Sequence, residues 1–379
     1  MAIVVVCQFA LAIYLPSVGA IRAWFSAEAG ATQALLSVYL IVFAVTQLAV
    51  GPLADRYGRR RILIVGLALF GAASLLCATA PSFAVLLLGR AVQAVGACAG
   101  VMLTRAMVRD VFSGPAAMRA MSLISAAGAL APALSPLAGG QLQLLFGWWA
   151  SFAATGLAAL ALVALSWRLL PETGQAGGHV ESLAGLWRGY AMVLRRRRFL
   201  GFTLNGTCAT GAFYVFLAGA PELLIERRGV PLEMFGWFTF AWAGSFVVGS
   251  LSSGRLAQRH GPARMVPLGV ALLTVGGLAM AATGLAGSTA LGAIVLPLML
   301  MGFGNGFTMP SSLAGAMAAV PASVAGTASA AIGVAQVGGG ALISFLSGLV
   351  PHTDQTPIGL GIALIGTVSA LSFLLLSRK

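Results

Sequence analysis

Residue types that could carry out chemistry are scarce in this sequence of 379 residues, which contains 9 Asp and Glu, 3 His and 4 Cys. The histidines, His179, His260 and His352, all fall in polar stretches between apolar runs. The sequence has no HExxH, nucleophile-elbow or P-loop pattern. It therefore predicts no catalytic residue, no cofactor and no metal site. The cysteines lie in apolar runs without CxxC spacing, so we expect free, buried thiols.

One charged residue stands out by its position. Arg90 lies about seven residues inside an apolar run, roughly 10 Å deep at about 1.5 Å per residue. Gln93 follows one helical turn later on the same face. If the run spans a membrane, a charge at that depth is costly and usually faces a cavity or a partner. The pair is predicted to form a polar cavity wall that relays protons or orients a ligand. Alternatively, Arg90 snorkels to the outer surface.

Polar and aromatic residues at helical spacing supply further candidates. Tyr39, Phe43 and Gln47 would share one helix face. Asn205 and Phe213 would share another. A mostly apolar cavity with scattered hydrogen-bonding groups suits lipophilic molecules; alternatively, each aromatic side chain packs in a bundle core. The predicted cavity residues are Tyr14, Tyr39, Phe43, Gln47, Arg90, Gln93, Asn205, Phe213, Tyr214, Trp242, Asn305 and Gln336.

The composition indicates the elements that must position these residues. Hydrophobic residues make up 59% of the chain and charged residues 8%, about a third of the charged share in soluble domains. A soluble core cannot absorb so much apolar surface, and too little of the chain is polar for disorder. Only helices or closed barrels satisfy the backbone in lipid, and the apolar runs lack the alternation of barrel strands. We therefore predict an all-α integral membrane fold.

Twelve apolar runs are long enough to cross a membrane, which takes about 20 residues. The predicted spans are 2–21, 33–53, 62–80, 83–104, 121–143, 148–170, 199–220, 234–254, 265–286, 289–309, 326–349 and 357–376. Met1 leads almost directly into the first run, so we expect either an uncleaved first span or a lost cytoplasmic start.

The net charge of +13 reflects basic residues in alternate loops. If the chain starts inside, 18 Arg and Lys face the cytoplasm and 3 face outward. This bias predicts a multi-pass protein with both termini cytoplasmic. Arginines in short cytoplasmic loops meet anionic lipid heads, so no nucleic-acid partner is expected.

An internal repeat predicts two halves. Residues 51–61 read GPLADRYGRRR and residues 254–264 read GRLAQRHGPAR, with six of eleven positions identical. Each segment follows the second span of its half. We predict six-helix halves at 1–170 and 199–379, joined by a cytoplasmic linker at 171–198.

Several of these segments resemble known family motifs. GPLADRYGRRR is similar to the loop signature between the second and third helices of the major facilitator superfamily, LLLGRAVQAVGACAG to its fourth-helix motif, and GALAPALSPLAGG to its fifth-helix exporter motif. AIYLPSV, TRAMVRDVF, FGWWASF, FYVFLAGAPELLI and GTASAAIGVAQ resemble the Bcr/CflA-type branch, which includes chloramphenicol and bicyclomycin exporters.

The resemblance implies a cytoplasmic gate. Asp55 would face the N-terminus of the eleventh helix near Gly326, where the helix dipole favours an anion, and Arg105 or Arg109 would pair with it. Alternatively, these charges only set the topology. The implied gate residues are Gly51, Asp55, Arg56, Gly58, Arg59, Arg105 and Arg109.

The resemblance also implies an exporter motif at Pro132, Pro136, Gly139 and Gly140. Its prolines should bend the fifth helix, and its glycines should let a neighbour approach closely. Generic small-residue packing is the alternative.

One acidic residue is absent from its expected place. The branch usually carries an acid just before its YLP triplet in the first helix, and here that position is Ala12. Glu222, just after Pro221, is predicted as a substitute group for proton coupling. An ion pair with Arg227 or Arg228 at the outer rim is the alternative.

Together these features imply a secondary transporter that exports small lipophilic drugs in exchange for protons across the bacterial inner membrane. Substrate would bind near the midplane between the halves during alternating access. The expected partners are that substrate, protons and membrane lipid, and we expect a monomer. A metabolite importer or uniporter on the same fold is the alternative that Ala12 keeps open. A membrane receptor or enzyme is a more remote one.

Overall fold

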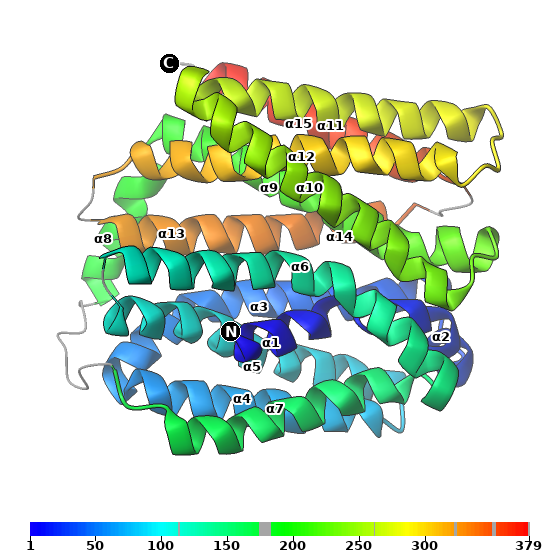
Figure 1. Cartoon of the computed structure of the whole chain (residues 1–379). Helices are drawn as coiled ribbons and strands as arrows, with labels where there is room; N and C mark the ends of the chain where they lie inside the picture. The colour runs from blue at the N-terminus through cyan, green and yellow to red at the C-terminus, as the bar shows by residue number, and fades with distance from the viewer. Residues whose placement is uncertain (113, 174–182, 261, 322–323, 351–353, 378–379) are drawn as a thin grey trace. The chain divides into compact units, whose positions relative to one another are not determined.

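The computed structural model describes residues 1–112, 114–173, 183–260, 262–321, 324–350 and 354–377. At some helical positions, among them Asp55 and Arg109, only the backbone is described. Every regular element in these ranges is a helix (Figure 1). Contacts divide the chain into two compact units, Met1–Val180 with Pro231–Gly236, and Glu181–Val230 with Trp237–Lys379.

The first unit contains the helices α1 to α7. Their bounds are α1 Ala2–Ala12, η1 Leu15–Ser17, α2 Val18–Phe25, α3 Ala29–Tyr57, α4 Arg59–Ala78, α5 Phe83–Val111, α6 Gly114–Phe146 and α7 Trp149–Leu169. The first span is interrupted, because Pro16 lacks a backbone N–H and lies in the 3-10 turn η1 between α1 and α2.

The second unit contains most of the remaining helices, and α10 begins in the stretch that clusters with the first unit. The bounds are α8 Leu183–Leu194, α9 Arg197–Ala220, η2 Pro221–Arg227, α10 Leu232–His260, α11 Pro262–Leu285, α12 Gly292–Ala318, α13 Ala325–Val334, η4 Ala335–Gly339, α14 Gly340–Ser347, α15 Thr356–Ser372 and η5 Phe373–Ser377. The short helix α8 lies inside the predicted linker.

Twelve helical segments have the length and composition to cross a membrane, as predicted. Eleven described segments are long and apolar enough to span a bilayer. The twelfth is α6, which has 33 residues and carries no charge from Met121 to Phe146. The predicted spans differ from these segments at their ends, and the first and eleventh predicted spans each consist of three successive helical elements.

Small residues bring the helices of the first unit together. A Cβ built on Gly66 in α4 would lie 2.6 Å from the Cβ of Ala99 in α5. One built on Gly71, also in α4, would lie 2.9 Å from Leu160 in α7. Such close approach maximises van der Waals contact where lipid offers no hydrophobic driving force.

Glycines also allow close helix packing in the second unit. A Cβ on Gly304 in α12 would lie 2.7 Å from the carbonyl oxygen of Gly269 in α11. A Cβ on Gly277 in α11 would lie 2.9 Å from that of Gly359 in α15. In the first unit α4 thus contacts α5 and α7 through glycines, and in the second unit α11 contacts α12 and α15 in the same way. These are the third, fourth and sixth spans of each unit, a correspondence that fits the predicted duplication.

Candidate functional site

The Arg90 guanidinium lies at the centre of a buried cluster in the first unit. Its side chain is 0% exposed, so it does not snorkel to the surface. Nε donates to the Leu35 carbonyl (3.3 Å), and Nη1 donates to the Ala10 carbonyl (2.9 Å) and to Gln93 Oε1 (2.6 Å). Gln93 in turn donates to Ser74 Oγ at 2.7 Å. The predicted Arg90–Gln93 pair is thus a hydrogen-bonded unit in α5 that ties α1, α3 and α4 together.

Two tyrosine rings enclose the same guanidinium. Arg90 Cζ lies 4.5 Å from the ring centroid of Tyr14 and 4.3 Å from that of Tyr39. Tyr14 stacks on Phe152 of α7, and Tyr39 stacks on Phe43. The negative faces of aromatic rings attract a cation, most strongly where water is excluded. Four of the predicted cavity residues therefore gather around Arg90 or one ring away from it.

This cluster holds a charge without a counter-charge. No carboxylate of the described residues pairs with Arg90, and its Nη2 has no hydrogen-bond partner among them. Ala10 lies in the last turn of α1, where the helix dipole is negative and the carbonyls lack partners within the helix. Ala12, at the position where the resemblance implied an acid, is fully buried. Carbonyls, an amide and aromatic faces therefore stabilise the guanidinium.

A second aromatic cluster lies in the second unit. Phe213 of α9 stacks on Trp242 of α10 with ring centroids 3.9 Å apart, and Tyr214 lies beside Phe213 at 5.9 Å. Asn305 of α12 donates to the Ala209 carbonyl at 3.0 Å, while its buried Oδ1 has no partner among the described residues. Phe213, Trp242 and Asn305 border one small void with no room for a water molecule.

Three other predicted cavity residues lie outside these two clusters. Asn205 joins α9 to α15, because it donates to Ser372 Oγ (3.1 Å) and accepts from Ser369 Oγ (2.7 Å). Gln336, in the π-helical turn η4, packs against Gly206 of α9. Gln47 is half-buried on α3. Asn205 therefore has a structural contact that sequence spacing did not predict.

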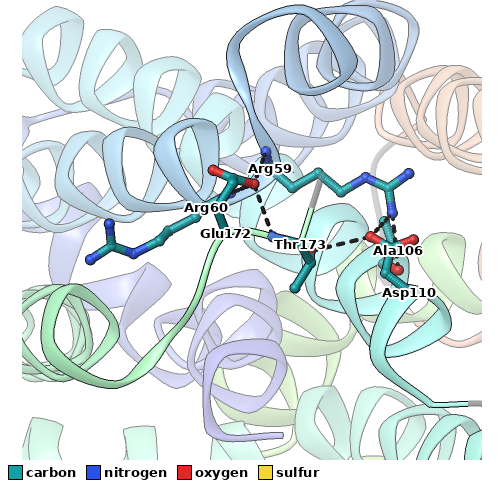
Figure 2. A network of polar contacts seen from close by, with 6 residues as sticks. All are labelled: Arg59, Arg60, Ala106, Asp110, Glu172 and Thr173. Carbon is teal, nitrogen blue, oxygen red and sulfur yellow. Dashed lines mark hydrogen bonds and ion pairs between the residues drawn. The ribbon is translucent and has the colours of Figure 1, made fainter. Parts of the chain in front are cut away.

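A polar network connects helix ends at one side of the first unit (Figure 2). Glu172 Oε1 accepts the backbone N–H groups of Arg59 (2.9 Å), Arg60 (3.2 Å) and Thr173 (3.1 Å). Because α4 begins at Arg59, this carboxylate satisfies its first two free N–H groups and lies at the positive end of the helix dipole. Glu172 thus caps α4 from the segment that follows α7.

The same network reaches α5 through Asp110. Arg59 Nη1 donates to Asp110 Oδ2 and to the Ala106 carbonyl, the latter at 3.2 Å. Thr173 Oγ1 also donates to Asp110 Oδ2, at 3.2 Å. Figure 2 shows Arg59 extended between the two carboxylates, with its backbone at one and its guanidinium at the other. The start of α4, the end of α5 and the segment after α7 are therefore joined.

Gly58 makes this arrangement possible. It ends α3 with φ of +92°, a conformation that only glycine adopts without strain. A Cβ at this position would also lie 2.7 Å from Glu172 Oε2. The motif glycine is needed both for the turn and for the approach of the capping carboxylate.

The remaining gate residues are placed as follows. Arg56 lies over the ring of Tyr57 at 5.2 Å. Gly51 has open space beside it, and Arg105 Nη2 would lie 3.7 Å from a Cβ on Gly128 of α6. The side chains of Asp55 and Arg109 lie outside the described residues, so their pairing stays a prediction. The sequence did not reveal the network of Asp110 and Glu172, since these partners are 51 and 113 residues from Arg59.

The exporter-motif residues lie in one continuous helix. Pro132 and Pro136 are inside α6. A Cβ on Gly139 would overlap the carbonyl oxygen of Ile13, and one on Gly140 would lie 2.6 Å from that of Leu232, in the segment that clusters with this unit. These glycines therefore allow backbone-to-backbone contact.

Glu222 lies in the π-helical turn η2. Its Oε1 is 3.7 Å from Arg227 Nη2, an ion pair in which the two side chains are 21% and 51% exposed. Arg228 instead donates to Ser288 O at 2.8 Å and to Gln355 Oε1 at 2.5 Å. This geometry matches the alternative role predicted for Glu222, an ion pair with Arg227.

No group of three or more potential metal ligands occurs among the described residues.

Comparison with known proteins gives the family: the profile of the Major Facilitator Superfamily matches residues 1–344. The chain belongs to this superfamily. It is therefore a multi-pass membrane transporter and not an enzyme, as its motifs indicated.

Relatives and solved structures extend this result. The chloramphenicol resistance protein of Pseudomonas aeruginosa is 31% identical over 293 residues, covering 77% of this chain and 69% of that protein. Multidrug resistance protein D of Escherichia coli (strain K12) is 26% identical and covers 100% of this chain and 94% of that protein. A crystallised D-xylose–proton symporter aligns with a TM-score of 0.77 at 15% identity, over 100% of this chain and 96% of that one. This last similarity confirms the fold of two six-helix halves.

Proposed function

We propose that this superfamily member exports small lipophilic compounds across the bacterial inner membrane, coupled to proton entry, by alternating access. Its relatives named for chloramphenicol and multidrug resistance support the direction and the substrate class. The basic loops support an orientation with both termini in the cytoplasm. We propose that the transporter works as a monomer.

The observation that carries the proposal is the buried Arg90 guanidinium, which lies between the rings of Tyr14 and Tyr39. Arg90 Nη2 is a buried donor without a partner among the described residues. A carbonyl, nitro or hydroxyl oxygen of a lipophilic substrate would be a suitable acceptor, while Tyr14, Tyr39 and Phe43 would contact its apolar parts. Phe213, Trp242 and Asn305 remain proposed substrate-contact residues of the second unit.

Two further groups would control the transport cycle. The proposed cytoplasmic gate contains the motif residues together with Asp110 and Glu172, because these acids connect the start of α4 to α5 and α7. Gly139 and Gly140 would hold α6 against its neighbours and bias the cycle toward export. Glu222 is our candidate for the coupling carboxylate, since it is half-buried in an irregular helical turn.

A uniporter is the second candidate function. It is favoured by Ala12, which leaves the buried part of the first helix without the acid that the drug-resistance branch usually has. A uniporter would move substrate down its own gradient and would need no titratable group beside Arg90.

Inverted membrane vesicles distinguish the two functions. Vesicles containing the full chain would be given radiolabelled chloramphenicol and other lipophilic drugs, with and without an imposed inward-acid pH gradient. Accumulation that depends on this gradient supports proton antiport. Accumulation of the same size without a gradient supports the uniporter.

Variants test the residues in the same assay. Arg90→Gln should abolish uptake, whereas Arg255→Gln, which removes an exposed charge, should leave it unchanged. Glu222→Gln should remove the pH dependence. Normal uptake by Arg90→Gln would contradict the proposed binding role.

A further inference from the structure

A groove on the second unit has an unusual combination of lining groups. It has a volume of about 790 Å³ and is formed by the beginnings of α9 and α11 together with the end of α15 and η5. Apolar side chains such as Val270, Val275 and Leu374 form most of its lining. Two arginines, Arg198 and Arg264, lie at its polar end. The groove is therefore amphipathic along its length.

The length of the groove along α11 follows from the helix geometry. On α11 the lining residues run from Arg264 to Val275, a rise of roughly 17 Å at about 1.5 Å per residue. That is about half the thickness of a bilayer's hydrocarbon core. Both arginines belong to the first turn of their spans, where a membrane boundary lies. The groove thus extends from one boundary toward the bilayer centre, as a lipid acyl chain does.

Within the described part of the chain, no carboxylate pairs with either guanidinium group. Neither Arg198 nor Arg264 forms an ion pair or a hydrogen bond with the other described residues, and both are exposed. The described carboxylates of this unit are Glu222 and Glu226 in η2 and Asp354 before α15. These lie at the opposite ends of α9 and α15 from the arginines. The positive charge at the groove mouth is therefore available to an external anion.

We propose that this groove binds one anionic phospholipid, with its phosphate between Arg198 and Arg264 and an acyl chain along α11 and α15. Basic pockets between transmembrane helices attract anionic head groups, and the apolar wall suits a chain that a soluble phosphate lacks. In the proposed orientation the lipid belongs to the cytoplasmic leaflet. The site is separate from Arg90 and does not depend on the transport activity.

Lipid titration of the full chain in detergent tests the proposal. Native mass spectrometry would count bound dioleoylphosphatidylglycerol and dioleoylphosphatidylcholine and give their apparent dissociation constants. We expect one phosphatidylglycerol to bind more tightly than phosphatidylcholine. The double variant Arg198→Gln/Arg264→Gln should weaken it about 25-fold, since each basic residue near an anionic lipid contributes about fivefold. Arg195→Gln/Arg255→Gln removes two exposed charges outside the groove lining and should change binding less than threefold.

A second pair of variants tests the apolar wall without changing charge. Ala271→Phe fills the groove and should weaken phosphatidylglycerol binding, whereas Ala282→Phe on the same helix lies outside the lining and should not. Glycerol 3-phosphate should not compete at millimolar concentration. Equal affinity for both lipids, equal loss in both arginine double variants, or competition by glycerol 3-phosphate would each overturn the proposal. A protein dimer that excludes the lipid would overturn it too.

Discussion

The close approach of α6 to the backbone at the end of α1 can be tested by adding a single methyl group. A Cβ on Gly139 of α6 would overlap the carbonyl oxygen of Ile13 more deeply than real Cβ atoms ever approach other atoms. A backbone carbonyl cannot rotate away, so α1 and α6 must separate, and overpacking of this kind costs about 3 kcal/mol. Alanine recovers about 1 kcal/mol through its higher helix propensity. Gly139→Ala should therefore destabilise the protein by about 2 kcal/mol.

Gly128→Ala is the matched control on the same helix. A Cβ there would have no neighbour nearer than 3.7 Å, an ordinary contact, so only the propensity gain of about 1 kcal/mol remains. Thermal unfolding in detergent should give a melting temperature several degrees lower for Gly139→Ala and slightly higher for Gly128→Ala, at about 2 °C per kcal/mol. A Gly139→Ala protein as stable as the wild type would refute the close α1–α6 contact.

Three further substitutions test other contacts. Glu172→Gln keeps the size of the cap but removes its charge, so it should cost about 1 kcal/mol in thermal unfolding, and Glu181→Gln in the predicted linker is its charge-matched comparison. Arg90→Lys cannot reproduce the three hydrogen bonds of a planar guanidinium, so vesicle uptake should fall at least tenfold despite the retained charge; wild-type uptake would show that charge alone suffices. Asn205→Leu leaves the Ser369 hydroxyl without its buried acceptor and should lower stability by about 1–3 kcal/mol, and an unchanged melting temperature would argue against the α9–α15 link.

The sequence predicted the membrane helices well because their signal is local. A span is defined by about 20 successive apolar residues, and no tertiary contact is needed to recognise it. The position of Arg90 inside an apolar run was also a local signal, and it predicted that the side chain faces a cavity or a partner. Gln93 followed from helical spacing alone.

The cytoplasmic network could not be predicted in this way. Glu172 and Asp110 acquire their roles only when α4, α5 and the segment after α7 come together. Surface acids in loops are common, and nothing in the sequence near Glu172 distinguishes a helix cap from a solvated charge. Only Gly58 carried a local signal, because a glycine between two helices indicates a turn with positive φ.

The absence of a first-helix acid changes what Arg90 can do. A carboxylate paired with a buried arginine would lose its negative charge when it binds a proton and regain that charge when the proton leaves, so the ion pair would depend on pH. Here its described partners are the Ala10 and Leu35 carbonyls, the Gln93 amide and the Tyr14 and Tyr39 rings. Carbonyls and amides do not titrate, and none of these partners is a carboxylate. Substrate contact with Arg90 should therefore be independent of pH from 5 to 8, and any proton coupling must enter elsewhere. Drug-binding affinity that is constant over this range, together with a pH-dependent rate of uptake, would separate binding from coupling in this transporter.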